Sequence, residues 1–401
     1  MHKIERLLQT LAPKGVEFRK LGEVCDFQKG KSITKKAVTF GKVPVISGGR
    51  QPAYYHNEAN RSGETIAISS SGVYAGYVSY WDIPVFLADS FSVSPKQKTL
   101  MPKYLFHYLT TQQDAIHATK STGGIPHVYS KDLQNFLIPI PPLEIQQEIV
   151  KILDAFTELN TELNTELKAR KKQYQYYQNM LLDFKGINSN HKDAKEKLVQ
   201  KTYPKRLKSL LQTLAPKGVE FRKLGEVCEI LDNRRIPIAK NKRNPGIYPY
   251  YGANGVQDYI DSYIFDGDFV LVGEDGSVIN KDNTPVVNWA SGKIWVNNHA
   301  HVLQTKNELK LKFLYFYLQT IDVSYCVAGT PPKINQENLK KITIPIPPLE
   351  IQQEIVKILD QFSILTTDLL AGIPAEIEAR KKQYEYYREK LLSFKPLQNK
   401  A

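Results

Sequence analysis

One stretch of the sequence occurs twice, letter for letter, and this repetition constrains the fold more than any other feature. IPIPPLEIQQEIVKILD stands at 138–154 and again at 344–360. A second block, LLQTLAPKGVEFRKLGEVC, stands at 7–25 and recurs unchanged at 210–228. Copies this far apart indicate a duplicated domain, because solenoid repeats have periods of only ~20–50 residues.

The order of the repeated blocks divides the 401-residue chain into six segments. We predict head 1 at 1–142, rod 1 at 143–184, a linker at 185–202, head 2 at 203–348, rod 2 at 349–394 and a tail at 395–401. Between their shared ends the heads have diverged, as GETIAISSSG (63–72) and GDFVLVGEDGS (267–277) show. Identical scaffolds with different faces indicate one protein that presents two specificities in the same geometry.

Each head has the pattern of a mixed domain. Short runs rich in β-branched and aromatic residues, bounded by Gly, Asn, Asp and Pro, predict strands. KYLFHYLTTQQDAI (103–116) and LKFLYFYLQTI (311–321) predict helices whose apolar faces pack on those strands. The expected fold class is therefore α/β (α+β), with two mixed α/β domains.

The rods predict two long helices. Their apolar residues recur at alternating steps of three and four, which is the seam of a coiled coil. Prolines precede both rods and stop either helix from extending backwards. The lysine-rich stretch at 186–205 predicts a flexible surface loop that returns the chain. Two rods joined in this way most simply pair antiparallel, with a pseudo-twofold axis relating one head to the other.

The rods differ in length. Between KILD and ARKK, rod 1 has 14 residues (155–168) and rod 2 has 18 (361–378). Rod 1 carries a TELN-TELN-TELK repeat, and the longer rod 2 contains Gly372 and Pro374, which could kink or loop it. One tetrapeptide adds ~6 Å and a net rotation of ~40° to a helix. One base pair turns DNA by roughly 35°, so the repeat could adjust how two heads meet DNA; a slipped repeat without consequence is the alternative.

The net charge of +13 is concentrated in the heads, with +7 on head 1 and +5 on head 2. This distribution favours two polyanion-binding heads, although a merely soluble basic surface is the alternative. Three cysteines are too few for a disulfide framework, so we expect Cys25 and Cys228 to be reduced core residues. No apolar run approaches the ~20 residues that span a bilayer, and the N-terminus lacks the pattern of a secretory signal. We expect a cytoplasmic protein with no membrane partner.

Two divergent domains, each followed by a proline-led IPIPPLEIQQEIV helix, resemble the specificity (S) subunit of type I restriction–modification systems. The resemblance covers essentially the whole chain. It implies that each head is a target recognition domain for one half of a bipartite, asymmetric double-stranded DNA site, and that an antiparallel coiled coil sets the spacer. It also implies two methyltransferase (M) subunits on the rods and restriction (R) subunits bound through them. S-adenosylmethionine, ATP and Mg would then belong to partner subunits, with no cofactor in this chain.

Catalytic motifs are missing from the sequence. None of the Pro-Pro pairs follows Asn or Asp, as the base-holding motif of an adenine methyltransferase requires. Gly30-Lys31-Ser32 resembles the end of a phosphate loop, but Cys25 stands where its first glycine belongs. His299 and His301 could face one side of a strand, and no third zinc ligand is near them in the sequence. The expected function is non-catalytic; a standalone DNA-binding regulator or coiled-coil adaptor is the alternative.

Candidate DNA-contacting residues are polar or aromatic side chains on predicted loops, because such side chains read base edges or fix phosphates. In head 1 they are Lys29, Lys31, Lys35, Ser47, Gly48, Gly49, Arg50, Tyr54, Arg61, Ser70, Tyr74, Lys120, Thr122 and His127. In head 2 they are Asn233, Arg234, Arg235, Lys240, Lys242, Arg243, Tyr251, Asn254, Glu274, Asp275, Ser277, Asn298, His299, Thr330 and Lys333. The alternative to DNA contact is a structural role for these residues, as half-buried strand residues, as parts of tight turns or as parts of a solvated loop.

The rods repeat polar residues that lie off the apolar seam. They are Gln146, Gln147, Glu148, Gln352, Gln353 and Glu354. Identical surfaces on both rods suit two copies of one partner, which we take to be the M subunit. Shared ancestry of the two copies is the alternative reason for their identity.

Overall fold

The computed structural model describes residues 2–96, 98–121, 124–188, 193–276, 278–367 and 372–397. The chain forms two compact units. Unit 1 comprises Met1–Asn164 and Glu376–Ala401, and unit 2 comprises Thr165–Ala375. Each unit therefore combines one head with parts of both rods. Among the described residues, no helix is long and apolar enough to cross a membrane.

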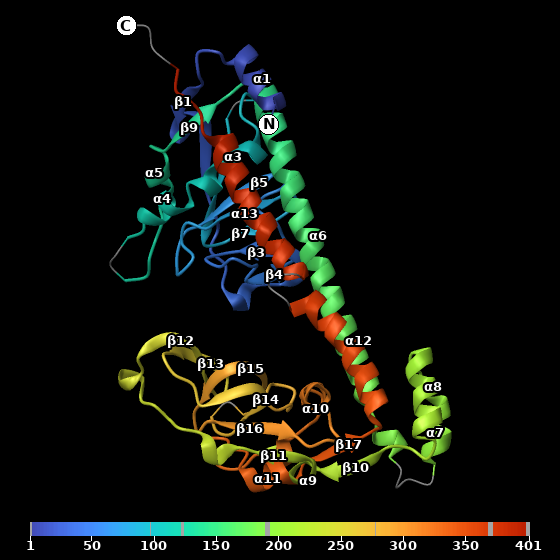
Figure 1. Ribbon diagram of the computed structural model, residues 1–401. Helices are drawn as coiled ribbons and strands as arrows, with labels where there is room; N and C mark the ends of the chain where they lie inside the picture. Colours follow the sequence, from blue (N-terminus) through green and yellow to red (C-terminus); the bar gives the residue numbers. More distant parts are fainter. Residues whose placement is uncertain are drawn as a thin grey trace. The chain divides into compact units, whose positions relative to one another are not determined.

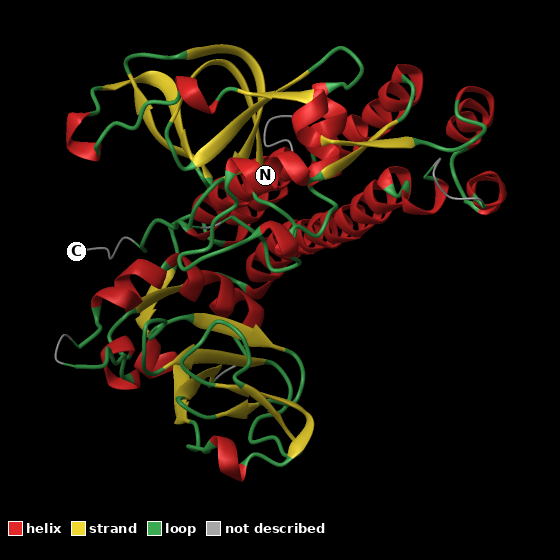
Figure 2. Ribbon diagram, turned by 90° about the horizontal axis from the view of Figure 1, so that it is seen from below, coloured by secondary structure: helices red, strands yellow, loops and turns green. Residues whose placement is uncertain are grey.

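Head 1 in unit 1 contains a four-stranded sheet of order β2-β8-β5-β6, a three-stranded sheet of order β4-β3-β7 and the pair β1-β9 (Figures 1 and 2). The first sheet is built from β2 (Cys25–Lys29), β5 (Thr65–Ser69), β6 (Val78–Trp81) and β8 (Ser90–Pro95). The second is built from β3 (Phe40–Ile46), β4 (Tyr54–His56) and β7 (Phe86–Leu87). Every residue of β5 is buried, as expected for the apolar run TIAIS in the middle of a sheet.

Helices complete unit 1. They are α1 (His2–Leu11), α2 (Leu21–Val24), η1 (Lys35–Ala37), α3 (Pro102–Thr111), α4 (Gln113–Ala118) and α5 (Ser130–Leu133). The predicted helix at 103–116 is thus two helices, α3 and α4. Tyr104, Leu105 and Leu109 of α3 join the core with Ile66 and Ile68 of β5, which confirms that this helix packs on the strands.

Head 2 in unit 2 is organised around a six-stranded sheet of order β11-β16-β14-β15-β12-β13. Its strands are β11 (Cys228–Ile230), β12 (Pro245–Gly252), β13 (Gly255–Ile260), β14 (Phe265–Gly273), β15 (Val287–Val296) and β16 (Ala300–Thr305). Its helical elements are α8 (Lys205–Leu214), α9 (Leu224–Val227), η3 (Asp232–Arg234), η4 (Lys240–Lys242), α10 (Leu311–Leu318), η5 (Ser324–Cys326) and α11 (Gln336–Lys341).

The blocks that the two copies share are the ones that pair with each other. In unit 1, β1 (Glu17–Lys20) pairs with β9 (Leu137–Ile140), with Glu17 opposite Ile140. In unit 2, β10 (Glu220–Lys223) pairs with β17 (Thr343–Ile346), with Glu220 opposite Ile346. The same antiparallel register in both units gives each head the same base, next to the start of a rod.

The rods are helices that pair antiparallel inside each unit. Rod 1 is α6 (Leu143–Leu182); the structure describes rod 2 as α12 (Leu349–Thr367) and α13 (Ile373–Leu392). In unit 1, Phe156 of α6 stacks on Tyr387 of α13 with ring centroids 5.6 Å apart. In unit 2, Tyr177 of α6 stacks on Phe362 of α12 at 5.1 Å. Early residues of one rod thus meet late residues of the other, which confirms the predicted antiparallel pairing.

The linker was predicted to be a flexible surface loop, and this is wrong for its described part: it contains η2 (Lys185–Ile187) and α7 (Ala194–Gln200), with Ile187 and Leu198 buried. Ile187 and Leu198 pack in one core with Leu207 and Leu211 of α8. Burial of this apolar surface offsets the entropy that the segment loses when it becomes ordered. In rod 2, Gly372 is a bend and α13 begins at the next residue, and residues 368–371 lie outside the described part.

Candidate nucleic-acid interface

Two loops of head 1 run side by side and form what we call loop pair 1, residues 70–72 and 126–128. The amide of Val128 donates to the carbonyl oxygen of Ser70 at 2.9 Å, and the amide of Gly72 donates to that of Pro126 at 3.0 Å. Ser71 and His127 face each other as an antiparallel bridge. The loop pair continues the β5 strand beyond its end at Ser69.

The other candidate loop of head 1 lies against loop pair 1. The Ser69 hydroxyl donates to the Ser47 carbonyl oxygen at 3.0 Å. A Cβ on Gly48 would lie only 2.5 Å from the Ser71 carbonyl oxygen, so the close approach requires glycine there. The structure thereby brings together the predicted residues at 47–50, 70–74 and 127.

Cationic side chains lie over the same region of head 1. The exposed Arg50 guanidinium stacks over the Tyr74 ring at 4.9 Å, and Lys120 donates to the Val73 carbonyl oxygen at 3.3 Å. His127 stacks on Tyr129 with ring centroids 5.9 Å apart. The loops therefore present positive charge and aromatic surface next to neutral hydroxyls.

Head 2 repeats this backbone arrangement in loop pair 2, residues 274–276 and 332–334. The amide of Ile334 donates to the Glu274 carbonyl oxygen at 2.8 Å, and the amide of Gly276 donates to that of Pro332 at 3.1 Å. Asp275 and Lys333 form the antiparallel bridge. Each contact of loop pair 1 thus has its counterpart, although the sequences of the loops differ.

The neighbouring strand ends carry a second correspondence. In head 1, the backbone amide of Ser70 donates to the carbonyl oxygen of Asp89. In head 2, the backbone amide of Glu274 donates to the carbonyl oxygen of His299. The Ser71 hydroxyl bonds the Asp89 carboxylate, whereas the Asp275 carboxylate bonds the His299 ring. The carboxylate thus belongs to Asp89 in head 1 but to Asp275, the equivalent of Ser71, in head 2. Equivalent positions therefore offer different hydrogen-bonding groups.

Under loop pair 2 lies a cluster of four charged or titratable residues, which we call the Asp232 cluster: Asp232, Arg235, Glu274 and His301. Their side chains are only 8%, 11%, 12% and 1% exposed. Arg235 Nη1 lies 2.6 Å from Glu274 Oε2, and Arg235 Nη2 lies 3.4 Å from Asp232 Oδ2. His301 Nδ1 lies 2.6 Å from Asp232 Oδ2. Buried charges are tolerated because each has a partner of opposite charge or a donor.

The pKa of Asp232 reflects this balance. Burial raises the pKa of the carboxyl group, but the hydrogen bond and charge of His301 and the charge of Arg235 outweigh burial, and the pKa lies below its ordinary value. The amide of Val302 also donates to Asp232 Oδ1 at 3.1 Å. Asp232 is therefore a stable anion that organises the donors around it.

The side-chain atoms of Asp232, Glu274 and His301 lie within 4.8 Å of one another, close enough for one metal ion to reach all three. No third zinc ligand stands near His301 in the sequence, but the fold brings Asp232 and Glu274 close to it. The donor set nevertheless fits a metal poorly, because Arg235 and Lys333 already contact the two carboxylate oxygens of Glu274 at 2.6 and 3.0 Å. His301 Nε2 is also taken, at 2.7 Å from the Ile334 carbonyl oxygen.

Three arginines that were predicted to contact DNA make hydrogen bonds, ion pairs or ring contacts inside the heads, so each has a structural role. Arg61 donates to the carbonyl oxygens of Gln28, Lys29 and Asn60 and to the Ser92 hydroxyl, and burial lowers its pKa. Arg243 stacks over Tyr250 at 4.0 Å and is 13% exposed. Arg235 belongs to the Asp232 cluster. Planar guanidinium groups with several fixed acceptors have few donors left for phosphate.

The remaining candidates fall into three groups. Asn298, His299 and Thr330 are exposed beside loop pair 2, and Tyr251 reaches the same strand ends because its carbonyl oxygen accepts from the Asn297 amide at 3.0 Å. A further group is exposed on other segments of the heads: Lys29, Lys31, Lys35, Asn233, Arg234, Lys240, Lys242 and Asn254. Tyr54 is half-buried on β4, while Thr122 and Ser277 lie outside the described residues.

On the rods, the partner-surface prediction is wrong for Gln146 and Gln352, which are fully buried. Gln146 Nε2 donates to the carbonyl oxygens of Thr99 and Pro141, and its Oε1 accepts from the Met101 amide at 2.9 Å. Gln352 makes the equivalent bonds to Glu308, Pro347 and Lys310. A side-chain amide with both ends satisfied is stable in a core, and here it fastens the start of each rod to its head.

Helices α1 and α8 cover the acidic neighbours of these glutamines. Glu148 pairs with Lys3, and Glu354 pairs with Arg206 at 3.1 Å, leaving the glutamate side chains 15% and 13% exposed. Only Gln147 and Gln353 of the six predicted residues are exposed. On α6, close to Gln147 in the sequence, a groove is lined by the apolar residues Ile152, Ala155, Phe156 and Leu159 together with Glu148 and Lys151, so rod 1 retains accessible surface near its predicted site.

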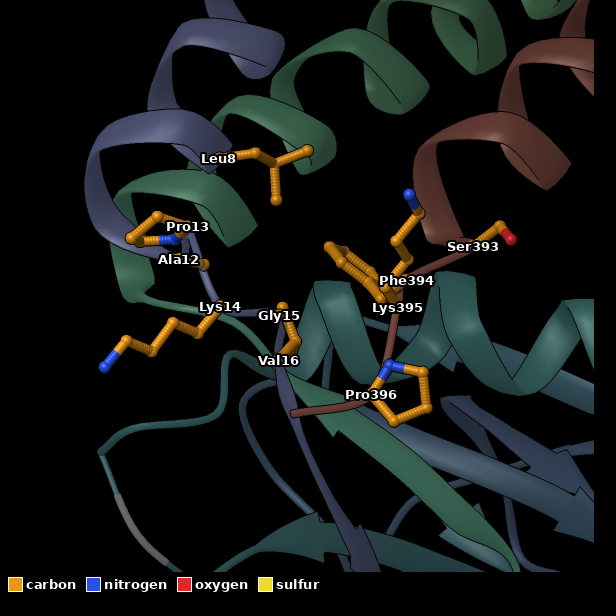
Figure 3. Close-up of a pocket in the computed structure, with 10 residues that line it drawn as sticks. All are labelled: Leu8, Ala12, Pro13, Lys14, Gly15, Val16, Ser393, Phe394, Lys395 and Pro396. Carbon is orange, nitrogen blue, oxygen red and sulfur yellow. The ribbon is translucent and has the colours of Figure 1, made fainter. Parts of the chain in front are cut away.

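A cavity of about 470 Å³ lies in unit 1 between the N-terminal segment and the tail. Figure 3 shows Leu8 and Ala12 on one side and Phe394 and Pro396 on the other, with the Lys14 side chain directed away. The tail is held by hydrogen bonds from Val16 N to Lys395 O and from Leu397 N to Val16 O. In unit 2, Ile187, Leu198 and Tyr203 pack with the equivalent Leu211 and Ala215, so the repeated blocks are packed more completely there.

These observations define a class of protein: a duplicated recognition protein, with one loop arrangement displayed twice on matching bases and rods. Known proteins agree with this description. The family described as "Type I restriction modification DNA specificity domain" matches residues 13–173 and again 216–379. The chain therefore belongs to the type I restriction–modification specificity family.

Individual relatives support the family over different parts of the chain. A type I restriction enzyme specificity subunit of Haemophilus influenzae is 45% identical over 44% of this chain and 46% of its own length. A type I specificity subunit of Mycoplasma pneumoniae is 34% identical over 64% of this chain and 95% of its own length. The crystal structure of an S subunit from M. genitalium matches with a TM-score of 0.64 at 18% identity, covering 94% of this chain and 96% of that one, and so shares the fold.

Sequence reasoning missed Asp232, Asp89 and His301 as parts of the site. Asp232 and His301 are joined by a hydrogen bond although they are 69 residues apart. The available signal was a polar residue at an inward position of a predicted strand, since His301 lies within AHVLQT with buried residues on both sides. Such a residue needs a buried partner, but the sequence does not say which one.

Proposed function

We propose that this chain is the non-catalytic DNA-recognition subunit of a type I restriction–modification enzyme. Each head would bind one half of a bipartite, asymmetric double-stranded DNA site, and the rods would set the spacer between the halves. The observation that carries the proposal is the pair of matching loops with different side chains. One scaffold with two different reading surfaces suits a site whose halves differ in sequence.

The side chains on the loop pairs support a role in base recognition. Loop pair 1 offers Ser71 and His127 beside Arg50, and loop pair 2 offers Asp275 and Lys333 beside His299. Lysine and arginine donate to guanine O6 and N7, and carboxylates accept from cytosine N4. The exposed lysines elsewhere on the heads would bind phosphate, which fixes orientation without reading sequence.

The partners follow from family membership and the rods. Two M subunits would bind the rods, near exposed Gln147 and Gln353, and R subunits would join through M. S-adenosylmethionine, ATP and Mg would be bound by those subunits, where adenine methylation and DNA cleavage would occur. The complex would act on DNA in the cytoplasm.

The test is to express the chain with its M subunit and to sequence the methylated adenines in host DNA. We expect a motif of two unlike halves separated by unspecified bases. Methylation that does not depend on this chain, combined with DNA binding by the chain alone at single undivided sites, would instead favour a standalone regulator.

Substitutions in the loop pairs test the assignment of one half-site to each head. Lys333→Ala should reduce discrimination in one half of the motif by roughly 10- to 100-fold, the usual range for a lost base contact. His127→Ala should affect only the other half. Equal weakening of both halves by either variant would contradict the assignment.

A further inference from the structure

The Asp232 cluster ties four separate segments of head 2 together. Asp232 follows β11, His301 lies on β16, Glu274 follows β14, and Ile334 belongs to the other strand of loop pair 2. His301 reaches both sides: Nδ1 contacts Asp232 at 2.6 Å and Nε2 contacts the Ile334 carbonyl oxygen at 2.7 Å. His301 therefore joins Asp232 to the second strand of loop pair 2.

Arg235 makes the second connection to loop pair 2. Its Nη1 donates to Glu274 Oε2 at 2.6 Å and to the Ala300 carbonyl oxygen at 2.8 Å. Lys333 contacts the other oxygen of Glu274, Oε1, at 3.0 Å and is 47% exposed. The cluster therefore contacts both strands of loop pair 2, one at Glu274 and the other at Ile334. Through Glu274 it also contacts the exposed Lys333.

Among the described residues of head 1, loop pair 1 has no equivalent of this cluster. The sheet register places Phe91 opposite Ile68 in head 1 and His301 opposite Val272 in head 2, at the same position of the third strand pairing. Ser70 occupies the position of Glu274, as the matching hydrogen bonds to Val128 and Ile334 establish. Phe91 is 3% exposed in an apolar core. Head 1 therefore supports the same backbone arrangement with packing and hydroxyl groups, and head 2 supports it with charges.

We propose that Arg235 and His301 are positioning residues of head 2, which hold loop pair 2 in register and thereby determine how strictly this head selects its DNA half-site. They act through Glu274 and Ile334 and do not touch DNA. This inference rests on the proposed function in DNA recognition. Long-range hydrogen bonds of a buried network fix geometry more strictly than apolar contacts do, because donors and acceptors must remain aligned.

The substitutions for the test are His301→Phe, which installs the residue of head 1, and Arg235→Lys, which keeps the charge but removes the planar fork. The matched control is Arg222→Gln. Arg222 also pairs with two carboxylates in head 2, Glu226 at 3.6 Å and Glu308 at 2.9 Å, and belongs to the base of the head. The full chain is assembled with its M subunit, and binding is measured on duplexes in which single bases of one half-site or the other are changed.

We expect both test variants to lower discrimination in one half-site by about tenfold or more, a typical cost of one mismatched base pair. Discrimination in the other half-site and binding by Arg222→Gln should stay within about twofold. Thermal unfolding is measured in parallel, and Arg235→Lys carries the test should His301→Phe not fold. Uniform loss of affinity with unchanged discrimination, or unchanged binding by folded variants, would overturn the positioning role. A wild-type complex that discriminates neither half-site would instead refute the proposed function itself.

Discussion

The two units exchange a buried histidine for a phenylalanine at two different places. In unit 1, His107 of α3 is buried and bonds Asp154 of α6 at 2.9 Å, and the equivalent residue in unit 2 is the buried Phe316. In unit 2, His301 lies under loop pair 2, and the equivalent residue in unit 1 is the buried Phe91. The exchanged imidazole therefore lies where the head meets the rod in unit 1 and beneath the candidate DNA-contacting loops in unit 2.

Divergence of the heads is therefore not confined to their surfaces. The bases of both heads share sequence, register and the buried glutamines. Above that base, one backbone arrangement of loops is supported by apolar packing in one unit and by ion pairs in the other. A recurrent backbone therefore does not imply a recurrent way of stabilising it, and the two units should respond differently to matched substitutions.

A change in the length of rod 1 should alter DNA recognition more than any other substitution or deletion considered for this chain. Residues 157–168 of rod 1 are an unbroken part of α6, so deleting Thr161–Asn164 should shorten a continuous helix by ~6 Å. We expect the affinity for the original site to fall by roughly 100-fold or more, because the two heads could no longer bind both half-sites at once. The methylated motif should reappear with the same two halves and a changed spacer. An unchanged spacer would show that rod length is irrelevant.

The buried glutamines test whether the shared base is equally important in both units. Gln352→Ala leaves the Lys310 amide and two carbonyl groups without their partner, and it should lower the free energy of unfolding of unit 2 by about 3 kcal/mol. Gln146→Ala should do the same to unit 1. Denaturant unfolding followed by hydrogen exchange of each unit measures both effects.

The control for this pair is the exposed neighbour. Gln147→Ala and Gln353→Ala should change stability by less than about 0.5 kcal/mol, as is usual for surface residues. A large loss from the exposed glutamines and none from the buried ones would contradict the fastening role of Gln146 and Gln352.

A smaller effect should distinguish the packing of the two repeated blocks. Ala215 in unit 2 is 7% exposed within a filled core, whereas the equivalent Ala12 in unit 1 borders the cavity of about 470 Å³. Ala215→Leu should therefore cost about 2 kcal/mol through overpacking, and Ala12→Leu should cost less than about 0.5 kcal/mol. The two variants are compared by the denaturant midpoint of their own unit. Equal costs would mean that the cavity does not accommodate a larger side chain.

The smallest effect concerns pH. Burial lowers the pKa of His107 below its ordinary value of 6.5, although Asp154 acts in the opposite direction. The unfolded chain therefore takes up a proton near pH 6.5 while the folded unit 1 does not, so stability is lost as the pH falls below that value. His107→Phe, which copies Phe316, should remove this loss. The Tm at pH 7.5 and pH 5.5 measures it, and an identical pH dependence in the variant would contradict the assignment.

The sequence was sufficient to predict the architecture because the repeated blocks are long and identical. The duplication, the mixed α/β heads and the antiparallel rods all follow from repeat order, hydrophobic spacing and the prolines before Leu143 and Leu349. The glycine-rich stretches at 47–50, 70–74 and 120–127 were singled out from the sequence, and their described parts lie together in head 1. Local patterns carry this information because they reflect local backbone preferences.

Which polar side chains are exposed, and which are buried and paired, depends on contacts between distant parts of the chain. The sequence does not distinguish Arg50, stacked and exposed on a loop, from Arg235, whose guanidinium is enclosed by two carboxylates. It likewise assigned Gln146 to a surface, whereas three hydrogen bonds hold that side chain in the core. Burial and pairing depend on contacts between residues far apart in the chain, such as Asp232 with His301, and no local pattern encodes those partners. The repeated blocks determined where the two heads stand in the chain; long-range pairing determined what each head can offer to DNA.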